Sequence, residues 1–288
     1  MQNQKLAYGI LLSLLILSLI LGGVIFYSKN FHELKVIFLN IGQGDAILIV
    51  QGKNQVLIDG GKSGKLLLER LGKFIPFWDR QVEAVVATHP DQDHIGGLAS
   101  VLQNYKVETV IETKAKSKTQ VYKRWENEIE KEQTQRVEAV RGARIKFPSG
   151  ALAEIIYPFY SLADSQSKDN NANSIVIKLA FGEEDFLLTG DLPSRQEKIL
   201  IDSGLDLQSR ILKAGHHGSK HSTSAEFLKS VKSEEAIISV GKNSYGHPHP
   251  DVLGRLREQG IKFWRTDEKG NIVYECKSRD EKCRRYFD

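Results

Sequence analysis

The sequence predicts an α/β protein in which two packed β-sheets are covered by helices, an αββα sandwich, with one transmembrane helix at the start. Short segments rich in β-branched and aliphatic residues recur along the chain, helical patterns separate the later ones, and one uncharged apolar run lies near the amino terminus. The 288 residues are 41% hydrophobic and 26% charged, with a net charge of +4. This balance excludes a wholly disordered or fibrous chain, and the charge alone does not identify a nucleic-acid binder.

Residues 7–27 form the apolar run, AYGILLSLLILSLILGGVIFY. As a helix it would be about 31 Å long, which is enough to cross a bilayer core. A cleaved signal peptide is the alternative, but the bulky residues 24–26 follow Gly22-Gly23 where a cleavage site would need small ones. We therefore expect an uncleaved signal-anchor that binds the lipid bilayer through residues 7–27.

The body is expected to lie outside the cytoplasm, in a single-pass protein of the cell membrane. Positive charge is similar on the two sides of the apolar run, so it does not fix the orientation. Cys276 and Cys283 have a spacing that suits a small disulfide-closed loop in an oxidising compartment, although two unpaired thiols fit nearly as well. We expect an anchor and linker over residues 1–33 and a body over residues 34–288.

Short apolar runs between glycine-containing or polar turns predict the strands of the body. They lie at 34–40, 46–50, 55–58, 82–87, 107–111, 144–147, 153–157, 174–179, 185–188, 209–213, 235–240, 262–265 and 271–274. Apolar residues at helical spacing predict helices at 63–75, 98–102, 194–203, 224–231 and 250–259. Residues 113–132 predict a charged helix or lid, and 161–173 a polar loop.

The strongest chemical signal directly follows the run 82–87, VEAVVA, whose mainly apolar character suits a strand buried on both faces. Residues 88–97 read THPDQDHIGG, and their ligand-type side chains are His89, Asp91, Asp93 and His94. Imidazole and carboxylate together suit Zn, Mn, Fe or a similar ion. We expect Gly96 and Gly97 to allow a tight turn beneath the site. A solvated polar loop is the alternative, but four such side chains in six residues favour a metal site.

Other predicted strands also end in a possible ligand next to glycine. Asp59 precedes Gly60-Gly61, Asp191 follows Gly190, and His216 and His217 follow Gly215. His247 lies in a further loop between Gly246 and Pro248. Because strand ends can gather at one edge of a sandwich, these sequence-distant side chains are expected to meet.

The motifs together resemble the metallo-β-lactamase fold superfamily, and within it the metallohydrolase domain of the ComEC-type DNA-uptake proteins and their stand-alone relatives. The resemblance covers about residues 34–275 and rests on the stretches 40–45, 57–61, 89–97, 170–174, 189–192, 215–219 and 247–250. It implies an αββα metallo-β-lactamase-like sandwich. It also implies DNA or another phosphodiester as substrate and a separate DNA-uptake channel as partner.

The resemblance further implies two divalent metal ions and a role for each candidate residue. His89 and Asp91 would hold one ion, and Asp93 and His94 the other. Asp191 would bridge both ions, and one of His216 and His217, with His216 preferred, would complete the second site. Asp59 would orient ligands from behind them. Asp93 and His247 are the candidate catalytic residues, and His247 would stabilise charge on the substrate or protonate the leaving group.

Two departures from the superfamily pattern bear on the metal. The common motif HxHxDH has Asp91 in place of its middle histidine, and a carboxylate there favours Mn²⁺ or Mg²⁺ over Zn²⁺. The superfamily also places a histidine between the later motifs, whereas this sequence has none between Ile95 and Gly215. The segment 171–174, NANS, falls in that gap, and amides are weak ligands.

We therefore expect a membrane-anchored, metal-dependent hydrolase, a phosphodiesterase or nuclease acting on DNA during DNA uptake. A hydrolase of a small ester or thioester is one alternative, because the same metals can activate attack on a carbonyl. A non-catalytic DNA-binding module on the same fold is the other, and the block from His89 to His94 weighs against it. Basic residues in 114–146 are interleaved with acidic ones, so they give little independent support for nucleic acid.

Overall fold

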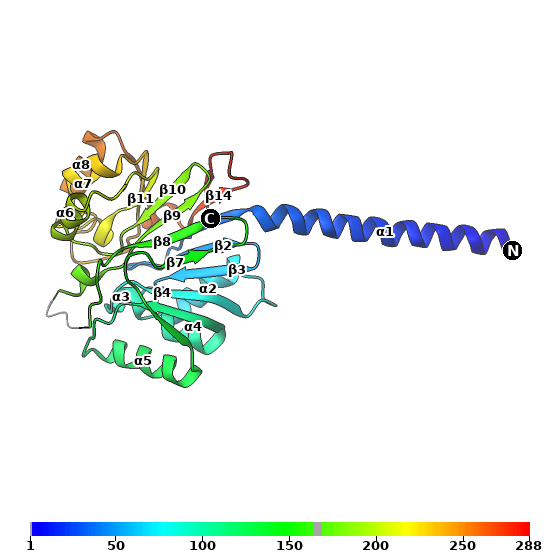
Figure 1. Cartoon of the computed structure of the whole chain (residues 1–288), viewed down its shortest axis with the longest axis horizontal. Coiled ribbons are helices and arrows are strands. Elements are labelled where there is room, and N and C mark those ends of the chain that lie inside the picture. The colour runs from blue at the N-terminus through cyan, green and yellow to red at the C-terminus, as the bar shows by residue number, and fades with distance from the viewer. Residues whose placement is uncertain (1, 164–168) are drawn as a thin grey trace.

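The computed structural model describes residues 2–163 and 169–288, which form two mixed β-sheets flanked by helices (Figure 1). Within these residues the first sheet has eight strands in the order β15-β14-β1-β2-β3-β4-β5-β6. Their bounds are β1 Leu34–Phe38, β2 Ile47–Gln51, β3 Asn54–Ile58, β4 Gln81–Ala87, β5 Lys106–Glu112, β6 Gln135–Glu138, β14 Ile272–Cys276 and β15 Arg284–Phe287. The strands from β3 to β6 pair in parallel, and the others pair antiparallel.

The second sheet of the described chain has seven strands in the order β13-β12-β11-β10-β9-β8-β7. Their bounds are β7 Arg144–Lys146, β8 Leu152–Tyr157, β9 Val176–Phe181, β10 Glu184–Leu188, β11 Ile211–Lys213, β12 Glu235–Ile238 and β13 Lys262–Arg265. The strands from β10 to β13 pair in parallel. Each sheet therefore has a parallel half, and the loops that follow those strands carry the site.

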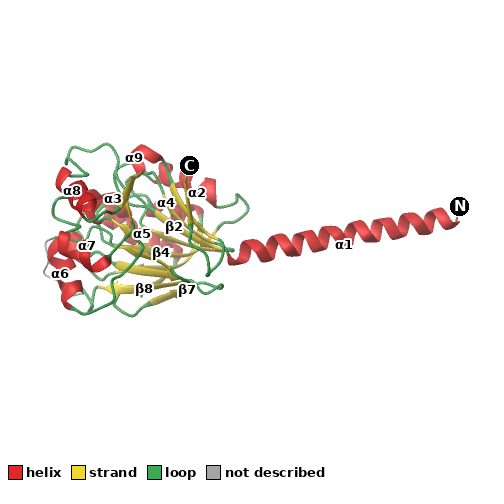
Figure 2. Cartoon of the chain, turned by 90° about the horizontal axis from the view of Figure 1, so that it is seen from above, coloured by secondary structure: helices red, strands yellow, loops and turns green. Residues whose placement is uncertain are grey.

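The helices α2, α4 and α5 lie on the outer face of the first sheet, α6, α7 and α8 lie on the outer face of the second, and α1 extends away from the body (Figure 2). The α-helices are α1 Gln2–His32, α2 Gly64–Phe74, α3 Gln92–Ile95, α4 Leu98–Asn104, α5 Gln120–Glu132, α6 Ser194–Asp202, α7 Ala225–Val231, α8 Pro250–Glu258 and α9 Thr266–Lys269. Two 3-10 turns, η1 Asn170–Asn173 and η2 Gly215–Gly218, lie beside the site.

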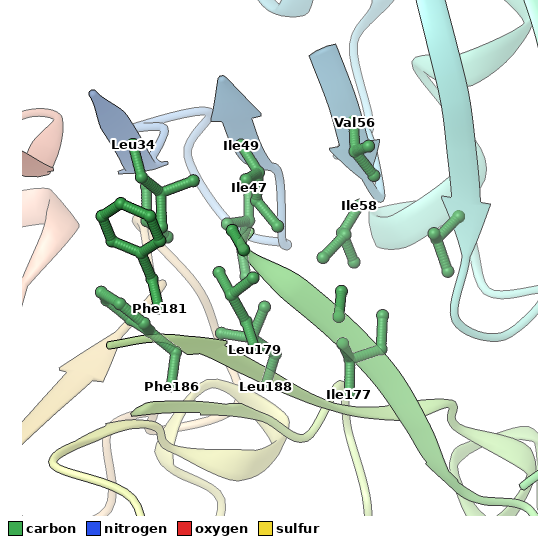
Figure 3. Packing of buried hydrophobic residues seen from close by; sticks show 14 of the residues in the cluster. Leu34, Ile47, Ile49, Val56, Ile58, Ile177, Leu179, Phe181, Phe186 and Leu188 are labelled. Atoms are coloured by element: carbon green, nitrogen blue, oxygen red, sulfur yellow. The ribbon is translucent and has the colours of Figure 1, made fainter. Parts of the chain in front are cut away.

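Three hydrophobic clusters hold the layers of the sandwich together. The first joins the facing sides of the two sheets, where Ile47, Ile49 and Val56 meet Ile177 and Leu179 (Figure 3). The second packs the first sheet against α2, α4 and α5, and the third packs the second sheet against α6, α7 and α8. The predicted αββα sandwich is confirmed.

Most predicted elements are present with shifted ends, and two strands were missed. The predicted strand 209–213 is shorter, because only Ile211–Lys213 pairs with its neighbours. β6 was not predicted because its charged sequence QRVE carries little apolar signal. β15 was not predicted because its sequence RRYF begins with two arginines, but it pairs with β14, and its Arg285 guanidinium carbon lies 4.0 Å from the centroid of the Trp264 ring. Of the predicted loop 161–173, residues 164–168 lie outside the described residues.

The amino-terminal run is helical, and Figure 1 shows α1 extending away from the body. Its large apolar side chains from Tyr8 to Leu21 are 49–70% exposed. In the part of the chain that the structure describes, no helix has the length and apolar character that crossing a bilayer requires, so the predicted transmembrane helix is not supported.

Cys276 and Cys283 form a disulfide that closes the turn between β14 and β15. Of the two states that the sequence left open, the structure therefore has the bridged one. The disulfide closes the hairpin of β14 and β15 at the edge of the first sheet, where β15 pairs with β14.

Gly96 and Gly97 are needed for a reason other than a turn. Both have right-handed φ values, −58° and −86°. A Cβ on Gly97, however, would lie 2.1 Å from the Gly60 carbonyl oxygen, and one on Gly96 would lie 2.8 Å from the Lys62 oxygen. The loops after β3 and β4 therefore pack backbone to backbone, and the Gly97 amide donates to the Gly61 oxygen at 2.9 Å.

We predict that Gly97→Ala lowers the free energy of unfolding by about 1–3 kcal/mol or more, because its methyl group would force the two loops apart. Gly72→Ala in α2 is the matched control, since nothing lies within 4 Å of its Cβ position. It should stabilise the protein by up to about 1 kcal/mol, through helix propensity. Urea unfolding measures both, and equal stability of the two variants would contradict the close approach.

Candidate metal centre

The loop after β4 delivers four of the predicted residues to the edge of the first sheet. His89 follows the strand, Asp91 stands at the N-cap position of α3 without a side-chain capping hydrogen bond, and the single turn of α3 carries Asp93 and His94. The His94 carbonyl accepts a hydrogen bond from the Gly60 amide at 2.6 Å, and the Asp93 carbonyl accepts one from Asp45 at 3.1 Å. Backbone bonds to two other loops therefore fix the direction of these side chains.

Asp191 brings the second sheet to the same place. It follows β10, and its amide donates to the Ser174 hydroxyl at 3.1 Å. Its Oδ2 lies 3.2 Å from His94 Nε2, 3.3 Å from His217 Nε2 and 3.7 Å from His216 Nε2. One carboxylate oxygen thus faces three imidazoles from two different loops.

Several buried nitrogens in this cluster have no hydrogen-bond donor or acceptor among the described residues. They are the Nε2 atoms of His89, His94 and His217. Donor atoms of His89, His94 and Asp191 lie within 4.8 Å of one another, and so do those of Asp93, His94 and His217. Because buried polar atoms are normally satisfied, this set of imidazole and carboxylate donors fits divalent metal ions.

Asp59 lies behind His94. Its Oδ2 is 2.7 Å from His94 Nδ1, and its two oxygens accept from the Thr88 amide at 2.8 Å and the Thr88 hydroxyl at 2.7 Å. With its Nδ1 proton held by Asp59, His94 would present the Nε2 lone pair to a metal ion bound in the cluster. This is the position that an orienting carboxylate requires.

His216 and His217 are presented by unusual backbone. Both have left-handed φ values, 50° and 53°, in the η2 turn after β11. The His217 ring is buried, with Nδ1 2.9 Å from the Ser239 carbonyl oxygen, and His216 is at the cluster's edge. Strain in non-glycine residues is typical of functional sites, and here it allows two consecutive histidines to face Asp191.

Asp45 and Lys213 belong to the cluster although the sequence assigned neither a role. Lys213 Nζ lies 2.5 Å from Asp45 Oδ2, donates to the Gly190 carbonyl oxygen at 2.9 Å and lies 3.6 Å from Asp191 Oδ1. Asp45 Oδ1 lies 3.4 Å from His217 Nδ1. The signal that could have revealed them is a lysine at the end of an otherwise apolar strand and an aspartate directly after Gly44.

The segment 170–174 lies in the part of the sequence that has no histidine, and its side chains contact three of the predicted metal ligands from outside the cluster. Asn170 Nδ2 donates to Asp91 Oδ1 at 2.6 Å, and Asn171 Nδ2 lies 3.3 Å from His216 Nδ1. The Ser174 hydroxyl lies 3.4 Å from His89 Nδ1. Amides and a hydroxyl therefore hold three predicted ligands in place.

His247 lies at the edge of the cluster, with its ring centroid 5.3 Å from that of His216. Burial and the nearby His216 and His217 lower the pKa of His247 to about 4. At neutral pH its imidazole is therefore uncharged, so it is a hydrogen-bond donor or acceptor rather than a ready proton donor.

Charge pairing dominates the centre of the cluster. Burial alone would raise the pKa of Asp191, but His217 and His94 hold that pKa well below its usual value. Burial would lower the pKa of His94 and of His217, but Asp191 raises both well above the usual value. Burial and the neighbouring His94 lower the pKa of His89. The carboxylates that stabilise these two imidazolium protons would stabilise metal cations in the same place.

The structure thus gathers most of the predicted residues. His89, Asp93, His94, Asp191 and His217 lie at the centre. Asp91 and His216 lie at its edge, where Asp91 Oδ2 is 3.7 Å from His89 Nε2 and His216 Nε2 is 3.7 Å from Asp191 Oδ2. His247 lies further from the centre and contacts the ring of His216. The assignment of each residue to one of two ions stays a prediction.

The sequence is similar to those of known proteins over most of its length. Residues 39–242 match the model of the metallo-β-lactamase superfamily. ComE operon protein 3 of Bacillus subtilis is 32% identical over 270 residues, which cover 86% of this chain and 34% of that protein. Competence protein ComA of Neisseria gonorrhoeae is 27% identical over 266 residues, which cover 89% of this chain and 35% of that protein. The chain therefore spans about a third of the length of these curated relatives.

Among solved structures, the metallo-β-lactamase fold protein YhfI of Bacillus subtilis superposes with a TM-score of 0.55. The match covers 84% of this chain and 100% of that one, at 12% identity. It shows that the two chains share a fold.

We predict that Asp59→Asn weakens binding of Mn²⁺ or Zn²⁺ by about 10- to 100-fold. Asparagine suits the left-handed φ of 59° at this position, so the backbone should not change. If the asparagine side-chain oxygen still accepts the hydrogen bond from the Thr88 amide, the asparagine NH₂ group faces His94 Nδ1. Nδ1 must then accept a hydrogen bond, so the imidazole proton lies on Nε2, where a metal would bind. Titration calorimetry measures the affinity, and unchanged binding in a folded variant would contradict the role of Asp59.

Proposed function

The chain belongs to the metallo-β-lactamase superfamily, and from this premise we propose that it is a metal-dependent phosphodiesterase that acts as a nuclease on DNA. One observation carries the metal-dependent part of the proposal. Three buried imidazole nitrogens without partners among the described residues surround the Asp191 carboxylate. Structural histidines are normally hydrogen-bonded, so this arrangement favours ligation.

The residues that would hold two divalent ions are His89, Asp91, Asp93, His94, Asp191 and either His216 or His217. Mn²⁺ or Zn²⁺ fits the mixed donors, and Mg²⁺ fits the carboxylates. Bound ions of this kind act as Lewis acids on a phosphoryl group and lower the pKa of water toward neutrality. Asp191, which faces ligands from both sheets, is suited to bridge the two ions.

The chain's own residues have separate tasks in this proposal. Asp59 and Ser174 orient His94 and His89, and the Lys213 ammonium lies 3.6 Å from Asp191 Oδ1, where it balances the charge of that carboxylate. Asp93 stays ionised, because the nearby His217 and His94 outweigh its burial and lower its pKa. His247 is uncharged, so it would donate an N–H hydrogen bond to the phosphoryl oxygen rather than protonate the leaving group.

The DNA substrate rests on the relatives rather than on the cluster. One curated relative is a competence protein by name, and the motifs resemble those of DNA-uptake proteins. We therefore propose that the protein acts on DNA during uptake, beside a separate channel. Because a shared fold does not fix the substrate, thioester hydrolysis and DNA binding without cleavage are outcomes of the test below.

We predict that the protein cleaves single-stranded DNA and bis-nitrophenyl phosphate in the presence of Mn²⁺, Zn²⁺ or Mg²⁺. Asp93→Ala and Asp191→Ala should each reduce this activity more than about 100-fold, since loss of a ligand should exceed the effect of losing an orienting partner. The control is Asp202→Asn, an exposed residue of α6 that pairs with Lys198. Cleavage of a thioester alone would indicate the small-ester hydrolase, and DNA binding without any cleavage would indicate the binding module.

We also propose that α1 binds the lipid bilayer through residues 7–27 and holds the body at the cell membrane, outside the cytoplasm. Support comes from its large exposed side chains, which are apolar from Tyr8 to Leu21. Exposed apolar surface of this extent is typical of interaction with a membrane or another protein.

We predict that the full chain floats with phosphatidylcholine vesicles in a density gradient, and that the double variant Leu14→Glu/Leu17→Glu does not. Each charge would have to leave water when the helix enters lipid, which costs about 2–4 kcal/mol at depth. Ile199→Glu, at an exposed position of α6, is the control and should float like the wild type. Flotation of the double variant would refute the proposal.

A further inference from the structure

An exposed aromatic side chain lies at the open side of the metal centre. Tyr245 is 66% exposed, and its ring centroid lies 5.8 Å from that of His247 at an interplanar angle of 32°. His247 in turn lies against His216, which faces Asp191. Three rings therefore lead from solvent to the carboxylate at the middle of the cluster.

The cluster is open on the side to which these rings lead. The side chain of Asp91 is 36% exposed, that of His216 is 29% exposed and that of Asp93 is 22% exposed. By contrast, the side chains of His94, Asp191 and His217 are no more than 3% exposed. A substrate that reaches the metals must enter past the exposed residues, and His216 is the one that borders His247.

The loop that carries Tyr245 is held in one conformation by Asn243. The Asn243 side-chain NH₂ group donates to the carbonyl oxygens of Gly241 and His247, each at 2.8 Å. Its Oδ1 accepts from the amides of Tyr245 at 3.0 Å and His247 at 3.1 Å. One side chain thus makes four hydrogen bonds across the loop, so the backbone that presents the tyrosine is already ordered before any ligand binds.

The base of the loop is fixed to the opposite sheet. The Gly241 amide donates to Gln43 Oε1 at 3.3 Å, and a Cβ on Gly241 would lie 2.3 Å from the Gly42 carbonyl carbon. This part of the second sheet therefore packs directly against the loop that ends in Asp45. The position of Tyr245 relative to the metal centre is thus set by the same packing that forms the centre.

Other exposed aromatic rings in the described chain lack this connection. Phe77 and Trp78 contact each other, and Tyr160 lies near Phe159. Tyr245 is the exposed ring that continues into the imidazoles of the cluster. A rigid, exposed ring at the entrance is suited to a flat ligand group that must be held while a neighbouring group reaches the metals.

We propose that Tyr245 is a stacking platform for a nucleobase, and that the site takes single-stranded nucleic acid. The inference rests on the proposed function, which puts the phosphodiester at the metals, and it adds the state of the strand. In a duplex both faces of a base are covered by its neighbours, whereas an unpaired base can stack on an aromatic side chain. Such stacking is possible with every base, so we expect the site to bind single strands with little dependence on base sequence.

The first test measures binding of a labelled single-stranded oligodeoxynucleotide to the full chain in the presence of a chelator, by fluorescence anisotropy. Tyr245→Leu should raise Kd by about 5- to 100-fold, whereas Tyr245→Phe and Tyr245→Trp should stay within about 2-fold of the wild type. Circular dichroism and thermal unfolding check that each variant is folded. Equal affinity of Tyr245→Leu and the wild type, or no binding by the wild type, would overturn the proposal.

The second test separates stacking from a general effect on the loop. An oligodeoxynucleotide of abasic residues keeps the phosphates and removes the bases, so Tyr245→Leu and the wild type should bind it equally. An equal loss on both oligonucleotides would overturn the proposal. In cleavage assays, Tyr245→Leu should raise KM for single-stranded DNA with little change in kcat.

The two tests also distinguish this inference from the proposed function. If the wild type fails to cleave DNA with every metal but Tyr245 contributes to binding as described, the nuclease proposal fails and the stacking platform stands. If cleavage occurs but Tyr245→Leu changes neither KM nor binding, the nuclease stands and the platform is refuted.

Discussion

The buried ion pair between Lys213 and Asp45 joins the two sheets at the edge where the site forms. Lys213 ends β11 in the second sheet, and Asp45 lies just before β2 in the first. Burial lowers the pKa of Lys213, but Asp45 and Asp191 outweigh it and keep the pKa above its usual value. Because an unpaired charge there would cost several kcal/mol, the pair requires the two strand ends to stay together.

This requirement explains how residues distant in sequence form one centre. The hydrophobic core between the sheets is non-directional and would tolerate small shifts of one sheet over the other. The ion pair and the Lys213 bond to the Gly190 carbonyl oxygen are directional, and they place Asp191 opposite His94 and His217. The precision of the site therefore comes from buried polar contacts that are added to the apolar packing.

The sequence was sufficient to predict the sandwich and the main candidate residues, because those signals are local. The block from His89 to His94 has its ligand-type residues within one loop, and the strands β4 and β10 each end in an apolar run, AVVA and FLL. The roles of Lys213 and Asp45 could not be predicted, because they depend on a contact between two residues that are 168 positions apart in the sequence. β15 was missed for a similar reason, since its basic residues become a strand only by pairing with β14.

The asparagine segment shows how a departure from a family pattern can be read physically. The superfamily histidine is absent, and in its place Asn170 and Asn171 bond to Asp91 and His216 from outside the centre. An amide N–H that donates to Asp91 leaves the other carboxylate oxygen free, which lies 3.7 Å from His89 Nε2. If Asp91 binds a metal ion as predicted, it supplies an oxygen donor where the family motif has a histidine, and such a donor favours harder ions such as Mn²⁺ and Mg²⁺. Asn170, which lies in the histidine gap, holds this carboxylate in place, so the two departures from the family pattern affect the same part of the cluster.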